Sequence, residues 1–326
     1  MKFSRILIIR SDSASRAEKF AKYYSNEIWK YAHEYELKIK EIFLEKVPFE
    51  DTTEVISGEF NRGDLILAVG GDGTARVAID AVMASSEDIR ENVAIAFLPL
   101  GNGNDFSRAI NHKNKVFREI ISQKITEFSP LEFEINRGEK RIFTPSYATL
   151  GITTAAVDLL NQDFIREKRR KFAKFSPVAA LSFRDLPGLS RKINQLEVED
   201  FSRDGRNYRD DSVGFFLVGA AHGLLPLRKF TKTDLFENQK FFFHSADIRG
   251  KFGGKTLFGK GLRAGGWTTF GLPGVKSTEE KLEFSHVSDL VLNTGGDNIV
   301  LEKVREIRVW RSEKTVKIFA NRSRNN

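Results

Sequence analysis

Hydrophobic and polar positions in the first third of the chain alternate between two periods. The short apolar run Ile6–Ile9 is typical of a strand that is buried on both faces. From Arg16 to Tyr35, apolar side chains recur every three or four residues, which predicts one face of a helix. The same reasoning predicts strands at 42–44, 65–69 and 93–98 and a short helix around 55–60. Strands that alternate with helices at this spacing predict a doubly wound, mostly parallel α/β domain.

The pattern changes after about residue 130, where short apolar runs are separated by Gly, Asn and Asp turns. These runs lie at 131–135, 195–198, 213–218, 240–243, 282–284 and 290–292, and one helical stretch is expected near 155–185. Such a pattern predicts a second, mostly antiparallel β domain.

Composition excludes several classes of protein. With 326 residues, 40% hydrophobic and 29% charged, the chain has the make-up of a soluble protein of two domains. It has no cysteine, which excludes disulfides, a thiolate nucleophile and Cys-ligated zinc. The first apolar run is too short for a signal peptide, and no segment has 18 consecutive apolar residues, so a cytoplasmic protein is expected. The net charge of +8 suits an anionic partner such as a nucleotide, a nucleic acid or an acidic membrane surface.

The sequence GGDGT, residues 70–74, follows directly on the predicted strand 65–69. Glycines between a strand and a helix allow backbone N–H groups to approach a phosphate, and the helix dipole favours the negative charge. Asp72 would repel phosphates by itself, so it indicates either a bridging Mg²⁺ or a base that accepts a proton from an attacking hydroxyl. The alternative is a tight turn in which Asp72 only caps the next helix.

A second glycine-rich loop, Pro99–Phe106, follows the next predicted strand. Ligands of open α/β sheets collect at such strand ends. Asn104 and Asp105 are therefore expected to hold polar groups of a nucleotide or to orient the first loop. The alternative is a second flexible turn, with Asp105 as a helix cap.

Other patterns fail on inspection. Neither loop fits the G-x-G-x-x-G pattern of dinucleotide-binding folds, and Gly253–Thr256 lacks the earlier glycine of a P-loop. The five histidines have no metal-ligand spacing, and His222 is best explained by packing. The basic cluster 166–171 suits either anionic lipid headgroups or a solvated helix face. No motif that reads bases is present, so nucleic acid is not expected as a partner.

Taken together, the two loops resemble the signatures of the diacylglycerol kinase catalytic-domain family, within a wider group that includes sphingosine kinases and NAD kinases. Residues 70–74 match its GGDGT signature in full. Residues 99–108 are similar to its P-x-G-T-x-N-D-[FL]-A-R signature, with Asn102 in place of threonine and Ser107 in place of alanine. Two signatures in this order are more specific than either alone.

The resemblance implies an α/β nucleotide-binding domain at residues 1–130 and a β-sandwich that binds the lipid acceptor at residues 131–303, with an active site between them. It also implies that the strand at 304–321 returns to the first domain. The implied activity is transfer of the γ-phosphate of ATP, with Mg²⁺, to a lipid hydroxyl.

The chain departs from the family in its later segments. The family's D-G-E signature, whose aspartate is thought to act as base, corresponds to Asn293–Asp297, where ungapped matching places Gly295 on the aspartate. Asp297 can take the place of the D-G-E aspartate only if this loop is rearranged. A simple hairpin turn explains the segment Asn293–Asp297 equally well. Bacterial members carry an acidic segment that organises magnesium. The nearest stretch in this chain is 231–238, in which only Glu237 corresponds to it. Asp72 is therefore the best candidate for the base.

The resulting site has three parts. The catalytic candidates are Asp72 and Asp297, and the candidate metal ligand is Glu237. The nucleotide-binding candidates are Gly70, Gly71, Gly73, Thr74, Gly101, Asn102, Gly103, Asn104 and Asp105.

Two other functions stay open. One is a pseudokinase that binds a nucleotide or a lipid without phosphoryl transfer, which the altered D-G-E segment favours. The other is a kinase of a soluble acceptor such as NAD. The expected partners are a lipid substrate and an anionic membrane surface at the inner face of the membrane, and the sequence leaves a homodimer open.

Overall fold

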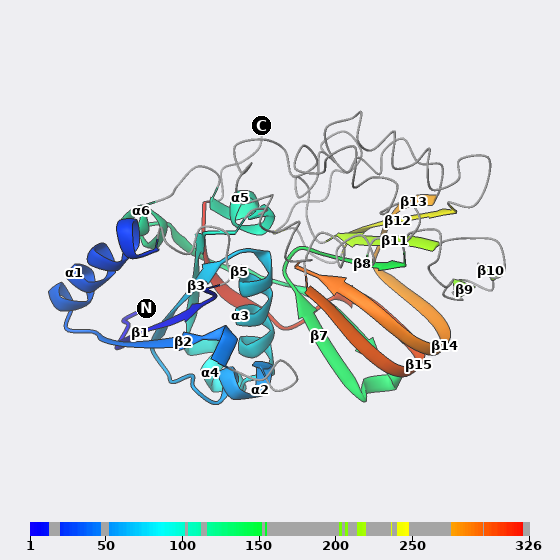
Figure 1. The fold of residues 1–326 in the computed structure, drawn as a ribbon, viewed down its shortest axis with the longest axis horizontal. Coiled ribbons are helices and arrows are strands. Elements are labelled where there is room, and N and C mark those ends of the chain that lie inside the picture. Colours follow the sequence, from blue (N-terminus) through cyan, green and yellow to red (C-terminus); the bar gives the residue numbers. More distant parts are fainter. Residues whose placement is uncertain are drawn as a thin grey trace, which may run out of the picture. The chain divides into compact units, whose positions relative to one another are not determined.

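The fold was analysed in a computed structural model of the chain. The structure describes residues 1–12, 20–46, 52–101, 104–111, 116–151, 154, 202–203, 206–207, 214–219, 236, 240–247, 275–295 and 297–321 (Figure 1). The chain divides into two compact units, each described here by itself. The first comprises Met1–Leu131, Phe143–Ser146 and Ser312–Asn326, and the second comprises Glu132–Ile142 and Tyr147–Arg311.

The elements of the first unit alternate between strands and helices. They are β1 (Arg5–Arg10), a π-helix (Phe20–Ser25), α1 (Asn26–Glu34), β2 (Lys38–Phe43), a 3-10 helix (Leu44–Lys46), α2 (Thr52–Ser57), β3 (Asp64–Gly70), α3 (Asp72–Ala84), α4 (Glu87–Asn92), β4 (Ala94–Pro99), α5 (Asp105–Asn111), α6 (Phe117–Ile121), β5 (Lys124–Phe128) and β16 (Val316–Ala320).

The strands of this unit form one sheet in the order β2-β1-β3-β4-β16-β5. Every neighbouring pair is parallel except β16 and β5, which are antiparallel. Strand β16 comes from the end of the chain and lies between β4 and β5. The predicted mostly parallel α/β sheet is therefore confirmed.

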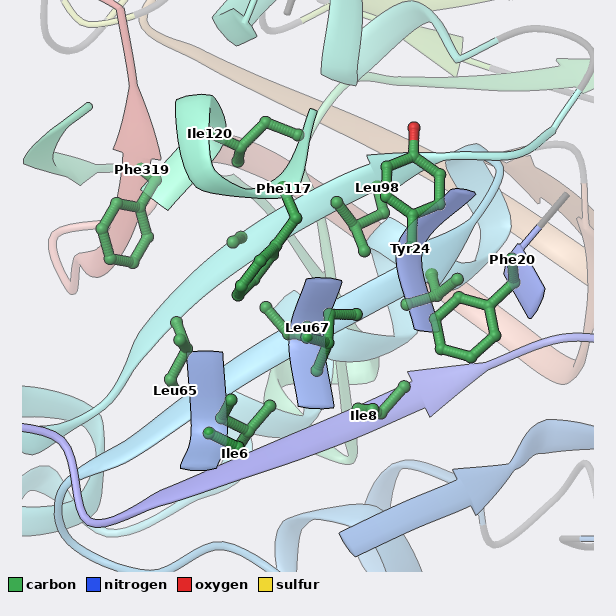
Figure 2. Packing of buried hydrophobic residues seen from close by; sticks show 14 of the residues in the cluster. Ile6, Ile8, Phe20, Tyr24, Leu65, Leu67, Leu98, Phe117, Ile120 and Phe319 are labelled. Carbon is green, nitrogen blue, oxygen red and sulfur yellow. The ribbon is translucent and has the colours of Figure 1, made fainter. Parts of the chain in front are cut away.

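Both faces of this sheet are buried, which explains why its central strands have continuous apolar runs. On one face, alternate residues of β1, β3 and β4 pack against the π-helix, α1 and α6 (Figure 2). Tyr24, Ile28 and Phe117 are among the helical side chains in this cluster. On the other face, α3 packs along β3 through its own buried aliphatic residues. Helices on both faces make the sheet doubly wound, as the sequence predicts.

The strand order places a switch point between β1 and β3. From β1 the chain moves outward to β2, and it then crosses back to β3 on the other side of β1. Loops diverge at such a point, so ligands of open α/β sheets bind beyond the carboxyl ends of these strands. The GGDGT loop begins at the carboxyl end of β3.

The strands of the second unit belong to one antiparallel sheet. They are β6 (Leu131–Ile135), β7 (Lys140–Thr144), β8 (Tyr147–Gly151), β9 (Ser202–Arg203), β10 (Arg206–Asn207), β11 (Gly214–Gly219), β12 (Phe241–Asp247), β13 (Val275–Glu279), β14 (Lys281–Thr294) and β15 (Asp297–Arg311); a 3-10 helix (Asn136–Gly138) joins β6 to β7. The main path runs β13-β12-β11-β8-β14-β15-β6-β7, with β9 and β10 at its side. The predicted antiparallel second domain is confirmed.

Several details differ from the sequence expectations. The apolar runs at 282–284 and 290–292, taken as separate strands, are parts of the long strand β14, which bulges between Ser285 and Leu290. All described strands of this unit are joined by hydrogen bonds into one antiparallel sheet. The returning segment begins at Ser312, because residues 304–310 belong to the part of β15 that pairs with β14. The helix expected near 155–185 lies outside the described residues.

Within the described part of the chain, no helix combines the length and the apolar character needed to cross a membrane.

Candidate functional site

The two glycine-rich loops leave the sheet side by side. Strands β3 and β4 are parallel neighbours, and Gly70 is opposite Pro99 at their carboxyl ends. The carbonyl oxygen of Gly70 accepts hydrogen bonds from the backbone N–H groups of Leu100 (2.7 Å) and Gly101 (3.0 Å). The end of β3 therefore fixes the start of the second loop.

A close backbone contact joins the loops, and it requires glycine on both sides. A Cβ atom placed on Gly101 would lie 2.4 Å from the Cα of Gly71, and one on Gly71 would lie 3.2 Å from the Cα of Gly101. Backbone atoms on both sides leave little room for adjustment, so a side chain would separate the loops. This contact explains why both motifs carry a glycine at these positions.

Asn104 closes the second loop on itself. Its Oδ1 accepts a hydrogen bond from the N–H of Gly101 (2.8 Å), and its Nδ2 donates to the Gly101 carbonyl (2.5 Å). The backbone of Asn104 has a φ of +52°, in the left-handed region that asparagine tolerates better than most residues. Asn104 is also buried. Its observed contacts give it the role of orienting the loops.

The amino end of α3 is suited to bind a phosphate. Its N-cap is Gly71, which has no side chain to cap the helix, so no N-cap side chain occupies the N–H groups of the first turn. Thr74 is buried with its Oγ1 directly over Gly70, where a Cβ on Gly70 would lie 2.1 Å away. An uncapped amino end on a 13-residue helix provides both N–H donors and a favourable dipole for an anion.

Asp72 is the first residue of α3, but its carboxylate reaches across to the second loop. Its Oδ1 accepts a hydrogen bond from the backbone N–H of Phe106 (3.0 Å), the second residue of α5. Burial raises the pKa of Asp72, while the hydrogen bond from Phe106 acts in the opposite direction. The interpretation of Asp72 as a cap of its own helix is therefore wrong, since it caps the neighbouring helix instead.

Asp105 and Asp72 form an interacting pair of acids. Burial, and then the nearby charge of Asp72, raise the pKa of Asp105 to about 7, against the opposing effect of Arg108. Arg108 makes a salt bridge and a hydrogen bond to Asp105 from one turn further along α5. Two carboxylates held in this way favour either a shared proton or a bound cation.

The chemistry of this pair fits Mg²⁺. Magnesium takes oxygen ligands and commonly uses only one or two carboxylates, with phosphate oxygens and waters completing its shell. Raised pKa values show that ionising both acids is costly without a compensating positive charge. The described residues contain no group of three or more His, Cys, Asp or Glu side chains suited to hold a metal. A magnesium ion here would therefore depend on the nucleotide phosphates.

The carboxyl end of β1 reaches the same edge of the sheet. The N–H of Ser11 donates to the carbonyl of Val69 (3.3 Å), the last residue before the GGDGT loop. The guanidinium of Arg10 stacks on Phe20 and Phe43, with its carbon 4.9 and 4.6 Å from their ring centroids. It also pairs with Asp12 at 2.6 Å. The end of β1 therefore lies beside the start of the GGDGT loop, as expected at the switch point.

The structure brings together most of the predicted nucleotide site. Gly70, Gly71, Asp72, Gly73, Thr74, Gly101, Asn104 and Asp105 lie in the two adjacent loops and the first turns of their helices. Asn102, Gly103 and Glu237 lie outside the described residues, as do His222 and the basic cluster 166–171.

Asp297 belongs to the second unit, in a β-hairpin. It is the first residue of β15 and pairs with Thr294 of β14, so the turn consists of two residues. Gly295 in this turn has a φ of +62°. The segment Asn293–Asn298 is therefore the hairpin turn that the sequence offered as the alternative to a rearranged D-G-E loop.

Sequence reasoning missed the residues that support α3. The buried Asp80 accepts hydrogen bonds from Thr53 Oγ1 (2.9 Å) and from the N–H of Phe143 (3.0 Å), and it pairs with Arg76 at 3.5 Å. The i, i+4 spacing of Arg76 and Asp80 is visible in the sequence, as is the i, i+3 spacing of Asp105 and Arg108. The contacts from Thr53 and Phe143 connect distant segments and leave no sequence signal.

An open, doubly wound sheet with a glycine loop at its switch point places the first unit in the class of α/β folds that bind ligands at the carboxyl ends of their strands. Comparison with known families gives this class a name. Residues 6–132 match the model of the diacylglycerol kinase catalytic domain. No curated protein matches the chain in sequence.

Solved structures show the same fold over nearly the whole chain. A "putative diacylglycerol kinase" of Bacillus anthracis str. Sterne matches with a TM-score of 0.61 at 15% identity, over 99% of this chain and 97% of that one. A second protein described in the same words and from the same strain gives 0.61 at 16% identity, over 98% of each chain. A diacylglycerol kinase of that strain gives 0.54 at 13% identity, over 99% of each chain. At these identities the likeness establishes the fold alone.

Proposed function

We propose that the chain is a lipid kinase that transfers the γ-phosphate of ATP to a lipid hydroxyl. This proposal rests mainly on the contact between the two loops at Gly71 and Gly101. Asp72 lies next to this contact, at the uncapped amino end of α3. The match of residues 6–132 to the model of the diacylglycerol kinase catalytic domain supports the same reaction.

The residues of the first unit have distinct parts in this reaction. Gly70, Gly71, Gly73 and Thr74 bind the phosphates through backbone N–H groups and the dipole of α3. Asn104 keeps the second loop closed against the first. Asp72 or Asp105 would hold Mg²⁺ together with the phosphates, and the ion would neutralise charge on the transferring group.

Asp72 is the base in this scheme. Its carboxylate accepts the proton of the acceptor hydroxyl while the hydroxyl oxygen forms a bond to the γ-phosphorus. The bond from that phosphorus to the bridging oxygen breaks, and ADP leaves. A base with a raised pKa holds the proton better near neutral pH than an ordinary aspartate does.

The hairpin at Gly295 favours a second candidate function. A two-residue turn occupies the position of the family's D-G-E signature, and ungapped matching places Gly295 on its aspartate. A pseudokinase that binds ATP without transferring phosphate is consistent with this loss. A third candidate, a kinase of a soluble acceptor, shares the same nucleotide site.

The decisive experiment measures transfer of the labelled γ-phosphate of Mg²⁺–ATP to diacylglycerol, monoacylglycerol and sphingoid bases in mixed micelles. Asp72→Asn is the control, because its remaining Oδ1 still accepts the hydrogen bond from Phe106. We expect transfer by the wild type and at least about 10²-fold less by the variant, with nearly unchanged melting temperatures. ATP binding without transfer to any lipid would favour the pseudokinase, and turnover that needs neither detergent nor vesicles would favour the soluble acceptor.

Membrane contact is a separate proposal. We propose that the chain, with its net charge of +8, binds peripherally to anionic membrane surfaces and there reaches its lipid substrate. Sedimentation with vesicles of rising phosphatidylserine content tests this. Loss of binding at high salt is expected if charge is the cause.

A further inference from the structure

Helix α1 of the first unit exposes one face that carries an indole ring and basic side chains. The residues of this face follow the spacing i, i+3, i+4, i+7, so they project from the same side of the helix. They are Asn26, Trp29, Lys30 and His33, here called the Trp29 face. All four are exposed, and Trp29 is 56% exposed. The buried side of the same helix carries Ile28 and Ala32.

The acids of α1 lie on its third side, toward α6. The carboxylate of Glu27 accepts hydrogen bonds from the backbone N–H groups of Phe117 (3.3 Å) and Arg118 (3.1 Å). Glu34 makes a salt bridge to the guanidinium of Arg118. The negative charges of the helix are therefore engaged by α6, and the Trp29 face contains no carboxylate.

The chemistry of the Trp29 face is complementary to an anionic lipid surface. An indole has an apolar ring and one N–H donor, and the headgroup region of a membrane accommodates both. Lys30 beside it is attracted by anionic headgroups, and the imidazole of His33 can donate a hydrogen bond to a phosphate oxygen.

A second copy of the chain fits this face less well. In a symmetric dimer the Trp29 face would meet its own copy, which would bring the two Lys30 side chains together. Like charges placed opposite one another oppose association. An anionic membrane surface has no such cost.

We propose that the Trp29 face is the part of the first unit that contacts an anionic membrane surface, with the indole of Trp29 in the headgroup region. The inference rests on the proposed function, because a lipid kinase meets its acceptor at a membrane. It gives the membrane contact a defined place on α1 and involves residues of the first unit alone.

The test is sedimentation of the full chain with phosphatidylcholine vesicles, with and without phosphatidylserine, for the wild type, Trp29→Ala and Lys30→Glu. We expect the wild type to prefer vesicles that contain phosphatidylserine. Each substitution should lower the partition coefficient about fivefold or more, the first through lost apolar contact and the second through charge. Both positions are exposed, so melting temperatures should stay nearly unchanged.

Two control variants match these changes. Tyr35→Ala removes an aromatic side chain that is equally exposed (55%) but stacks on Tyr31, with ring centroids 4.5 Å apart. Lys124→Glu makes the same change in net charge at an exposed position of β5, an edge strand of the sheet. Both controls are expected to bind vesicles nearly as the wild type does.

Tryptophan fluorescence supplies a readout of position. The emission of the wild type should shift to shorter wavelength when vesicles that contain phosphatidylserine are added, because the indole of Trp29 leaves water. Trp29→Phe keeps an aromatic ring at this position, so it should retain most of the binding but lose the shift.

Several results would overturn the inference: no binding of the wild type to vesicles that contain phosphatidylserine, unchanged binding by Trp29→Ala and Lys30→Glu, or equal losses in the two controls. Self-association that Trp29→Ala abolishes, without vesicle binding, would assign the face to a second copy instead. Transfer of phosphate to lipids in mixed micelles is measured separately. Transfer without vesicle binding would remove the Trp29 face and leave the proposed reaction, whereas vesicle binding through Trp29 without transfer would do the reverse.

Discussion

At the scale of single residues, the site depends on two glycines whose lack of a side chain lets the two loops meet. The Cα atoms of Gly71 and Gly101 meet where any side chain would collide. The two motifs are therefore coupled: the second loop positions the carboxylate of the first through Phe106, and the first loop limits which residues the second can carry.

Gly101→Ala should weaken both stability and nucleotide binding. Its Cβ would lie 2.4 Å from a backbone atom, so the loops must separate. We expect the free energy of unfolding to fall by about 1–3 kcal/mol and the Kd for ATP to rise. Urea unfolding and ATP titration measure these effects.

Gly58→Ala is the control for this change. Gly58 is exposed, and a Cβ there would lie 3.6 Å from its nearest neighbours, an ordinary contact. Equal effects of both substitutions would contradict the role of the Gly71–Gly101 contact.

The pKa of Asp105 makes stability depend on pH. Because its folded-state pKa, about 7, is above the ordinary value near 3.9, the folded protein keeps a proton that the unfolded chain loses in this range. The free energy of unfolding should therefore fall as pH rises from about 4 to about 7. We expect the free energy of unfolding, measured by urea titration with EDTA present, to be at least about 1 kcal/mol lower at pH 8 than at pH 5.

Asp105→Asn should reduce this slope, since it removes one acid of the pair. Asp88→Asn, at an exposed position paired with Arg62, should keep the wild-type slope. A wild-type stability that rises over this range would show that the pair does not titrate as described.

At the scale of elements, the position of α3 is fixed from its middle as well as from its amino end. Asp80 connects α3 to α2 through Thr53 and to β7 through Phe143, all in buried or part-buried surroundings. Helix α3 carries Asp72 at its first residue, so these contacts also hold the site in place.

Asp80→Ala should destabilise the fold strongly. It leaves Arg76 buried without its ion partner and removes an acceptor from the N–H of Phe143. We expect a loss of about 3 kcal/mol or more in the free energy of unfolding, measured with urea. Arg62→Ala, which breaks the exposed pair with Asp88, should change it by less than about 1 kcal/mol. Similar losses in both variants would argue against a special role of the buried pair.

At the scale of the whole molecule, the first unit is completed by the end of the chain. Strand β16 lies between β4 and β5, and its residues Val316, Ile318 and Ala320 are fully buried. Without this strand, β5 loses its partner and an edge of β4 is exposed.

Residues 1–131 alone should therefore fail to unfold cooperatively in urea. The N–H of Ser312 donates to the carbonyl of Pro130 (2.9 Å), so the two pieces can be joined directly. A chain of residues 1–131 linked through Asn-Gly to 312–326 should unfold cooperatively. Cooperative unfolding of residues 1–131 by themselves would contradict this view of β16.

The sequence by itself determined the class of the first unit and the positions of its two loops. Continuous apolar runs and regular helical spacing are local properties, because burial on one or two faces imposes them residue by residue. The motifs at 70–74 and 99–108 are equally local, and both follow strands where the pattern places them. The hairpin alternative for Asn293–Asn298 was also readable from its glycines.

Only the tertiary structure decided how these parts meet. The contact of Gly71 with Gly101 and the hydrogen bond from Phe106 to Asp72 join segments that are distant in the sequence. Strand register and backbone packing create such contacts, and neither follows from the pattern of a single segment. The same holds for the pKa of Asp105, since burial and the neighbouring Asp72 raise it only after the sheet has brought the loops together.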